Sequence, residues 1–286
     1  MAFSDRRDAK AVRGEDAFHK LLIHMYPRRC DSLAFFAESV DMTAVKDYIK
    51  RRNEEHPDTH ITIFHIFLAA MMHVAVKYPR LNRFIKRRRM YQRDHAEMAF
   101  VVKKRMAEDG EEGFVKAKFT GEDTLSTLAA FITKMINDVR ADKDEDAQGT
   151  MNILGKLPNF LLHFIVSVLS LTDNFKGMPR SLDALDPNQV GIFIANLAAL
   201  DLDAPFHHLN EWGTTSVFVT IGKMKPMPVV NPDNNAIEVR DVVNLAFTLD
   251  ERVADGFYFA QCLKLFRHLM KHPDLLERPA KEVFEF

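Results

Sequence analysis

Apolar positions along this chain alternate between short runs and helix-like stripes. The short runs predict strands over residues 33–40, 95–102, 114–119, 190–196, 217–224 and 237–249. Stripes at spacings of three and four predict helices over residues 17–25, 43–53, 61–78, 124–140 and 256–271. Asp41, Asp123 and Asp255 precede three of these helices and can accept the free amide protons of the first turn. The alternation of helices and strands predicts an α/β or α+β sandwich.

Two further features concern apolar helices with few polar residues. The helix over 61–78 is apolar nearly all round, which is typical of a helix inside a core. The run from Phe160 to Leu171 is too short for a membrane span, which needs about 20 apolar residues. We expect it to form a buried helix, because it lacks the basic polar face of an interfacial helix. The alternative is a helix that lies on a membrane surface or against a partner.

Composition limits the class of protein. The chain has 286 residues, 47% of them hydrophobic, and no long linker rich in Pro, Gly or Ser divides it, so a single domain over residues 1–286 is expected. The net charge of -1 gives no overall attraction to nucleic acid, and we expect no such partner. Two cysteines are too few for a disulfide framework, and the charged N-terminus does not read as a secretory signal. A cytoplasmic protein without a transmembrane segment is therefore expected.

One motif stands between the last predicted strand and the last predicted helix. Residues 250–256 read DERVADG. This stretch resembles the His-x-x-x-Asp-Gly signature of the 2-oxo acid dehydrogenase acyltransferase catalytic domain, whose fold is shared with chloramphenicol acetyltransferase. Asp255 and Gly256 match the signature, and Glu251 stands at the position of the histidine. Residues 38–45 (ESVDMTAV) and 78–85 (YPRLNRFI) are similar to two further stretches of the family.

The resemblance covers about residues 33–278 and implies a fold and an assembly. The implied fold is an α/β (α+β) two-layer sandwich, chloramphenicol acetyltransferase-like, with a mixed sheet and helices packed on it. Residues 149–185 have little counterpart in the family, so we expect them to form a helical insertion. The resemblance implies a homotrimer or a larger trimer-based assembly, with coenzyme A or an acyl-CoA as the small-molecule acyl donor. The core-like sequence begins without a lipoyl-bearing segment, so we do not expect a working component of a standard 2-oxo acid dehydrogenase complex.

The residues that would carry the family's chemistry differ here. In the resembling enzymes the histidine is the general base and a Ser or Thr hydroxyl stabilises the oxyanion. The matching strand reads FIAN over residues 193–196, which places Ala195 at the hydroxyl position and Asn196 beside it, both expected to contact the coenzyme. Loss of one oxyanion donor typically costs ~10² to 10³ in rate. Loss of a positioned base costs another ~10² to 10⁴.

Other residues are candidates for the missing base. Glu251 would need its pKa, ordinarily about 4.3, raised by burial, and the alternative is an ordinary polar residue paired with Arg252. His207 and His208 lie in a loop after the strand that holds Ala195, and either could replace the base. With Asp201, Asp203 and Glu211 they could also bind a metal, but the spacing fits no metal motif and we expect none. The alternative is that one histidine is buried and the other solvated.

The remaining predictions concern Asp255, Gly256 and a cluster of basic residues. Asp255 is expected to cap the last helix or, as the resemblance implies, to pair with Arg28 or Arg29, and Gly256 allows the close turn. A basic cluster could hold the coenzyme's phosphates or an acidic partner, or could be a solvated hairpin: Arg80, Arg83, Lys86, Arg87, Arg88, Arg89 and Arg93.

Two hypotheses about the function of the chain follow. The chain is a coenzyme A-dependent acyltransferase-like protein with altered catalytic residues, or it is a catalytically inactive trimeric binding or scaffold protein of the same fold.

Overall fold

A computed structural model describes residues 5–104, 112–141, 155–231 and 234–282 of the chain. Its main sheet has six strands in the order β2-β9-β8-β7-β5-β6. The strands are β2 (Leu33–Asp41), β5 (Ala96–Lys103), β6 (Glu112–Phe119), β7 (Ile192–Asn196), β8 (Val217–Val230) and β9 (Ile237–Asp250). Strand β7 runs parallel to β5 and β8, and the other pairs are antiparallel, so the sheet is mixed as predicted. A small antiparallel sheet joins β1 (Lys10–Ala11), β4 (Arg89–Gln92) and β3 (Arg83–Lys86).

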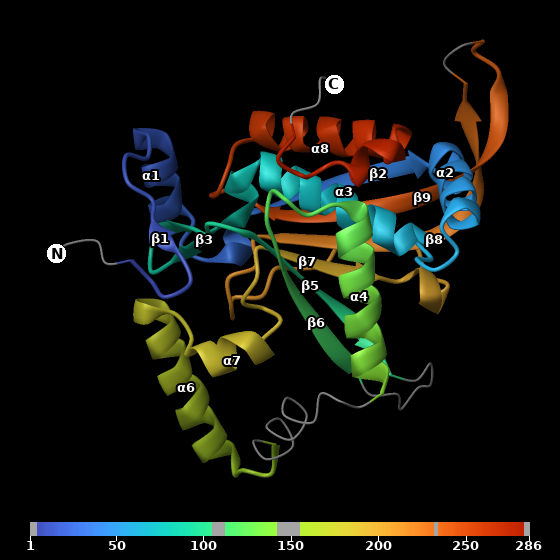
Figure 1. The fold of residues 1–286 in the computed structure, drawn as a ribbon. Helices are drawn as coiled ribbons and strands as arrows, with labels where there is room; N and C mark the ends of the chain where they lie inside the picture. The colour runs from blue at the N-terminus through green and yellow to red at the C-terminus, as the bar shows by residue number, and fades with distance from the viewer. Residues whose placement is uncertain (1–4, 105–111, 142–154, 232–233, 283–286) are drawn as a thin grey trace.

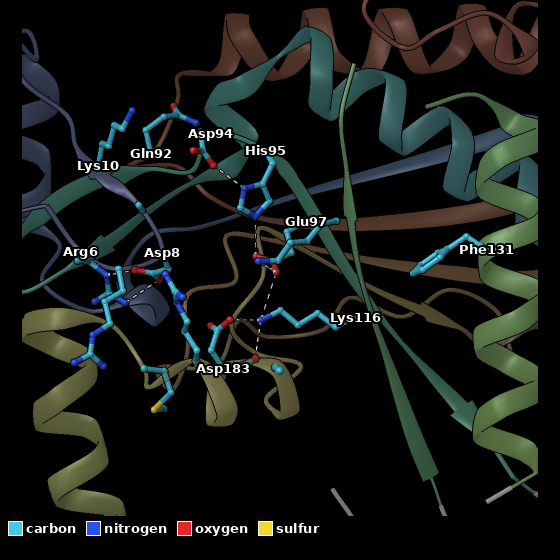
Figure 2. Close-up of a pocket in the computed structure, with 16 residues that line it drawn as sticks. Arg6, Asp8, Lys10, Gln92, Asp94, His95, Glu97, Lys116, Phe131 and Asp183 are labelled. Carbon is cyan, nitrogen blue, oxygen red and sulfur yellow. Dashed lines mark hydrogen bonds and ion pairs between the residues drawn. The ribbon is translucent and has the colours of Figure 1, made fainter. Parts of the chain in front are cut away.

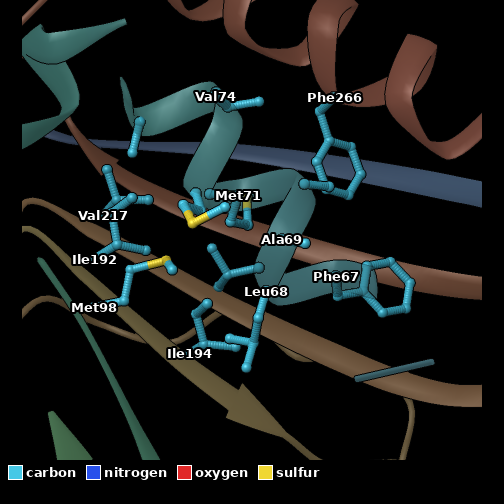
Figure 3. Packing of buried hydrophobic residues seen from close by; sticks show 14 of the residues in the cluster. Phe67, Leu68, Ala69, Met71, Val74, Met98, Ile192, Ile194, Val217 and Phe266 are labelled. Atoms are coloured by element: carbon cyan, nitrogen blue, oxygen red, sulfur yellow. The ribbon is translucent and has the colours of Figure 1, made fainter. Parts of the chain in front are cut away.

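Helices cover one face of the main sheet (Figure 1). They are α2 (Thr43–Glu55), α3 (Ile63–Lys77), α4 (Leu125–Arg140) and α8 (Gly256–Lys271). The central helix, α3, packs against the sheet and against α8, and its Phe67 stacks on Phe266 with ring centroids 6.3 Å apart (Figure 3). The predicted core helix and the two-layer sandwich with a mixed sheet are therefore confirmed.

Element boundaries follow the predicted pattern with local differences. Helices α1 (Ala17–Met25) and α8 begin and end at the predicted residues. Thr124, and not Asp123, caps α4, because its hydroxyl accepts the amide proton of Thr127. Strand β8 extends beyond its predicted end at Met224 to Val230, whereas β9 begins at the predicted Ile237 and ends one residue later than predicted, at Asp250. The two strands form a hairpin whose end is exposed at Val230 and Ile237. The predicted loop over residues 141–148 lies almost wholly outside the described residues.

In the described part of the region predicted as an insertion lie helices α6 (Asn159–Lys176) and α7 (Arg180–Leu185). The prediction that the apolar run forms a buried helix is wrong on burial. The only side chain that α6 buries is Asp173, while Phe160 is 77% exposed and Phe164 63%. The apolar pattern specifies side chains that avoid water, but it does not specify which surface covers them. Among the described residues, every helix is too short or too polar to cross a membrane.

Candidate functional site

The motif turn joins the end of β9 to the start of α8. Arg252 donates to both carboxylate oxygens of Asp250, at 2.8 and 2.7 Å, and both residues are buried. The Ser32 hydroxyl donates to Asp250 at 3.0 Å, and Arg252 also donates to the carbonyl oxygen of Tyr26 at 2.9 Å. The backbone amide of Glu251 donates to the carbonyl oxygen of Ser32 at 3.0 Å. These contacts fix the backbone of the turn on both sides of Glu251.

The Glu251 side chain is half-buried, and in the described parts of the chain it has no hydrogen bond or ion pair. The predicted pair with Arg252 is wrong, because that guanidinium binds Asp250 on the other side of the turn. Asp250 is the better partner, since its carboxylate is fully enclosed and needs a counter-charge. The carboxylate of Glu251 is thus left available to a neighbour or a substrate.

Asp255 acts as a helix cap, as predicted. Its carboxylate accepts the amide proton of Tyr258 at 2.8 Å, and Gly256 is the first residue of α8. The alternative ion pair with Arg28 or Arg29 is wrong within the chain. Arg28 pairs with Asp31 at 3.1 Å, and buried Arg29 donates to the carbonyl oxygens of the loop around Gly213. Each arginine therefore has a closer partner than Asp255.

Ala195 and Asn196 lie at the end of β7 and line a cavity of about 260 Å³. Its lining combines apolar side chains of α3, β5 and α4 with charged ones: Phe64, Phe100, Ile136, Lys103, Glu112 and Arg140. Ala195 pairs with Thr220, and Thr220 with Ala246. Glu251 lies five residues beyond Ala246, so strand rise and spacing place it roughly 19 Å from Ala195. One protomer does not bring the two predicted catalytic positions together.

His207 and His208 lie over the sheet face opposite the helices. The His207 ring stacks on Phe218 with centroids 4.1 Å apart, and its Nδ1 donates to the carbonyl oxygen of His208 at 2.8 Å. His208 Nε2 lies 2.9 Å from Asn210 Oδ1. Both rings therefore already have partners. His208 is exposed and His207 is half-buried.

The acidic residues near these histidines are also engaged. Asp201 pairs with Lys223 at 3.1 Å, and Asp203 pairs with Lys225. Glu211 accepts the amide proton of Cys30 at 3.1 Å. Within the described residues, the His, Cys, Asp and Glu side chains form no group of three or more that could hold a metal ion. The metal alternative at this loop therefore has no geometric support.

The predicted basic cluster does not form one surface. Lys86 and Arg93 are buried, with Lys86 2.7 Å from Asp173 and Arg93 3.1 Å from Glu97. Arg87 lies over the ring of Phe175, 3.7 Å from its centroid. The cluster divides because Lys86 and Arg93 turn inward to buried carboxylates, whereas Arg87 lies in the turn between β3 and β4.

A cavity that the sequence interpretation missed opens at the start of β5 and has a volume of about 810 Å³ (Figure 2). Glu97 is 2% exposed at its inner wall, with Lys116 Nζ 3.4 Å and His95 Nε2 3.6 Å from its carboxylate oxygens. Burial alone would raise the pKa of Glu97, but His95, Arg93 and Lys116 outweigh it and lower the pKa to about 2. The Glu97 carboxylate in turn raises the pKa of His95, which burial opposes and Asp94 supports. The sequence does contain a sign of this cluster. Glu97 is a carboxylate within an apolar predicted strand, and Lys116 and Lys118 alternate with apolar residues in the next predicted strand.

Part of this chain is similar to a known protein family. Residues 180–277 match the family model of the 2-oxoacid dehydrogenases acyltransferase (catalytic domain). No curated protein sequence matches the chain.

Solved structures give the fold. The dihydrolipoamide acetyltransferase of Azotobacter vinelandii is similar at a TM-score of 0.58 and 16% identity, over 93% of this chain and 94% of that one. The cubic core of the pyruvate dehydrogenase multienzyme complex is similar at a TM-score of 0.59 and 14% identity, over 93% of this chain and 94% of that one. A chloramphenicol acetyltransferase is similar at a TM-score of 0.55 and 14% identity, over 92% of this chain and 100% of that one. The resemblance inferred from the motifs is therefore confirmed: over residues 180–277 the chain matches the acyltransferase catalytic domain of the 2-oxoacid dehydrogenases, and its fold is that of chloramphenicol acetyltransferase.

Proposed function

We propose that this protein is a coenzyme A-dependent acyltransferase-like protein that uses altered catalytic residues. The observation that carries the proposal is the motif turn, whose buried Asp250–Arg252 pair holds the backbone while Glu251 keeps an uncommitted carboxylate. The Azotobacter vinelandii enzyme has been studied for the role of a serine, a histidine and an asparagine in its catalytic mechanism, the last two four residues apart. Glu251 and Asp255 have the same spacing here.

The proposed step needs one proton carrier. The Glu251 carboxylate accepts the proton of an acceptor thiol or hydroxyl, whose sulfur or oxygen bonds to the acyl carbon of the thioester. The bond from that carbon to the coenzyme sulfur then breaks, and the thiolate takes the proton. Ala195 offers a methyl group where a hydroxyl would steady the oxyanion, so we expect a rate lower by ~10² to 10³ than that of an enzyme with that donor.

The same proposal requires assembly. Glu251 and Ala195 lie roughly 19 Å apart within a protomer by strand rise and spacing, which is too far for one acyl group to contact both. We therefore propose a homotrimer or a larger trimer-based assembly, in which Glu251 of one copy faces the cavity beside Ala195 of the next. Similarity to the cubic core of a multienzyme complex supports this arrangement. Sedimentation equilibrium should give a mass that is a multiple of three times 32.9 kDa.

A second candidate is a catalytically inactive binding or scaffold protein. The observation that favours it is the lining of the Ala195 cavity, which contains no Ser, Thr or Tyr hydroxyl to stabilise an oxyanion. His207 and His208, the possible substitutes for the base, are held by Phe218 and Asn210. Both hypotheses share the fold and differ in turnover.

One assay separates the two candidates. Purified protein is incubated with acetyl-coenzyme A and a panel of thiol, amine and alcohol acceptors, and free thiol is followed. The enzyme hypothesis predicts turnover that Glu251→Gln removes and that Glu122→Gln, a surface control, leaves unchanged. Turnover that survives Glu251→Gln but is lost in His208→Ala would assign the base to the loop. Absence of turnover in all arms would leave the binding protein, and calorimetry with coenzyme A would then decide whether it still binds the coenzyme.

A gain-of-function variant tests the same site by restoring groups instead of removing them. The double change Ala195→Ser and Glu251→His restores the two groups that the resembling enzymes use. We expect it to raise acetyl transfer above that of the unchanged protein. No gain, in protein that keeps its assembly, would indicate that the channel between the two positions is closed.

A further inference from the structure

The cavity of Figure 2 is built partly by the region predicted as an insertion. Lys116 of β6 donates to the carboxylate and the carbonyl oxygen of Asp183 in α7, at 3.1 and 2.7 Å. Asp173 of α6 binds Arg6 at 2.9 Å and Lys86 at 2.7 Å. These contacts hold the insertion and the N-terminal segment against the edge of the sheet. The space between them is the cavity of about 810 Å³.

The lining of this cavity has more positive than negative charge. Its six lysine and arginine residues are Arg6, Arg7, Lys10, Lys116, Lys118 and Arg180. Its four carboxylates are Asp8, Asp94, Glu97 and Asp183. Six minus four leaves a surplus of two positive charges before His95 is counted. The buried shell behind the lining adds Arg93 and Lys86 against Asp173, so it does not cancel the surplus.

The surplus lies at the rim of the cavity. Each lining carboxylate has a cationic or imidazole partner, as Asp8 has in Arg6 at 2.9 Å and Asp94 in His95 at 2.7 Å. Arg7, Lys10 and Arg180 are exposed, and none of the described residues forms an ion pair with them. Lys10 is close enough to Asp94 to help lower the pKa of that carboxyl group, but no carboxylate holds Lys10, Arg7 or Arg180 in an ion pair within the described residues. Such cations around a concave surface attract an anion and form charge-assisted hydrogen bonds with it.

The lining of the cavity also includes four apolar residues: Ala9, Phe131, Met178 and Ala184. They do not form one wall, because Ala9 follows Asp8 in the chain, whereas the Phe131 ring points toward the cavity from α4, on the side opposite Arg6 and Asp8 (Figure 2). The Phe131 side chain is 41% exposed although it is large and apolar. The space is far larger than an inorganic anion needs, and lies in the usual range for a small-molecule pocket.

We propose that this cavity is a binding site for a small organic phosphate, whose dianionic head lies among Arg7, Lys10 and Arg180 and whose apolar part lies against Phe131. The charge surplus of two favours a dianion over a carboxylate. The site is separate from the proposed acyl-transfer site, since Ala195 lies at the opposite end of the β5–β7 pair and Glu251 follows a strand three positions away in the sheet.

Calorimetry on the full chain tests the proposal with phenyl phosphate as the probe. We expect phenyl phosphate to bind at least tenfold more tightly than inorganic phosphate and than benzoate, because only the first offers both the dianion and the ring. Lys10→Ser with Arg180→Ser should weaken phenyl phosphate at least tenfold. The matched control, Lys20→Ser with Lys50→Ser, removes two exposed lysines elsewhere and should change nothing. Phe131→Ser should weaken phenyl phosphate but leave inorganic phosphate unchanged.

Several outcomes would overturn the proposal. They are no binding of phenyl phosphate, equal loss in the control variant, or benzoate binding as tightly as phenyl phosphate. Displacement of phenyl phosphate by coenzyme A would overturn the separation of the two sites. The experiment needs no turnover, so its result does not depend on whether the acyl-transfer proposal holds.

Discussion

Two buried carboxylate–arginine pairs lie at the same end of the main sheet, and they are built differently. At the end of β9, both carboxylate oxygens of Asp250 accept from the Arg252 guanidinium, and the Arg252 backbone amide and the Ser32 hydroxyl also donate to that carboxylate. At the start of β5, Glu97 is shared between Arg93, His95 and Lys116 at 3.1 to 3.6 Å, and it lines a cavity. The first pair is closed and bidentate, and the second is an open cluster.

The difference shows what a buried charge does in each place. The Asp250–Arg252 pair fixes a backbone turn, because removing either group leaves the other without compensation. The Glu97 cluster anchors side chains from β5 and β6 beside a space that a ligand can enter. A closed pair specifies conformation, whereas an open cluster provides a surface for binding. The predictions below test whether the two differ in this way.

The largest expected effect is on the closed pair. Arg252→Met leaves Asp250 buried without its counter-charge and should lower the free energy of unfolding by about 3–5 kcal/mol. Urea denaturation followed by circular dichroism measures this. Arg28→Met is the matched control, since the Arg28–Asp31 pair lies at the surface, and its urea midpoint should stay near that of the unchanged protein. Equal loss in both variants would contradict the structural role of the pair.

The open cluster should respond less to loss of its carboxylate. Glu97→Gln keeps the shape of the side chain and leaves Arg93, His95 and Lys116 with uncompensated charge. Lys116 keeps Asp183, Arg93 keeps Asp8 at 3.9 Å and its hydrogen bond to Thr214, and His95 lines the cavity, so we expect a loss of about 2–3 kcal/mol in unfolding free energy. A loss greater than that of Arg252→Met would show that the cluster is as closed as the motif turn.

The pH dependence of stability reports on the same cluster. The pKa of Glu97 is lowered to about 2, so its stabilisation is present above its ordinary pKa of 4.5 and is lost as the pH falls toward 2. The pKa of His95 is raised, so its stabilisation is present below its ordinary pKa of 6.5 and is lost as the pH rises through its folded value. The shift in the pKa of Glu97 corresponds to roughly 3 kcal/mol in all, of which about 2 kcal/mol should be lost between neutral pH and pH 3.

Urea midpoints at four pH values between 3 and 9 would measure both effects. The acid-side loss should be smaller in Glu97→Gln than in the unchanged protein, and the alkaline-side loss smaller in His95→Asn. Unchanged profiles in both variants would show that the cluster does not hold these protonation states.

The sequence predicted the local features of the molecule better than the distant ones. The bounds of α8 and the Asp255 cap follow from spacing and from the hydrogen-bonding needs of a helix start, which are local. Helices α3 and α6 have similar apolar patterns, yet α3 lies in the core and α6 leaves Phe160 exposed. Hydrophobicity states a preference for burial, and the tertiary arrangement decides whether a surface is available.

The candidate site shows the same limit. The motif located Glu251 and Ala195, but their separation depends on strand register across β7, β8 and β9. Glu97 was missed because two of its partners, Lys116 and Lys118, come from β6, about twenty residues further on, although Arg93 and His95 are its neighbours in the sequence. The prediction for Arg29 failed for a related reason, since its partners lie in the distant loop around Gly213, whereas Arg28 pairs locally with Asp31, three residues further on.

The smallest expected effect concerns the outer edge of the open cluster. Lys118 lies 3.7 Å from Glu97, but its side chain is 60% exposed, so solvent screens the contact and replaces it when the lysine is removed. Lys118→Ser should therefore change the unfolding free energy by less than about 0.5 kcal/mol. Lys116→Ser is the matched comparison, because that lysine is 10% exposed and binds both Glu97 and Asp183, and its urea midpoint should fall clearly further. Equal losses of unfolding free energy in the two variants would show that the inner wall of the cavity is held no more tightly than its solvated rim. The distinction between a closed pair and an open cluster would then fail as well.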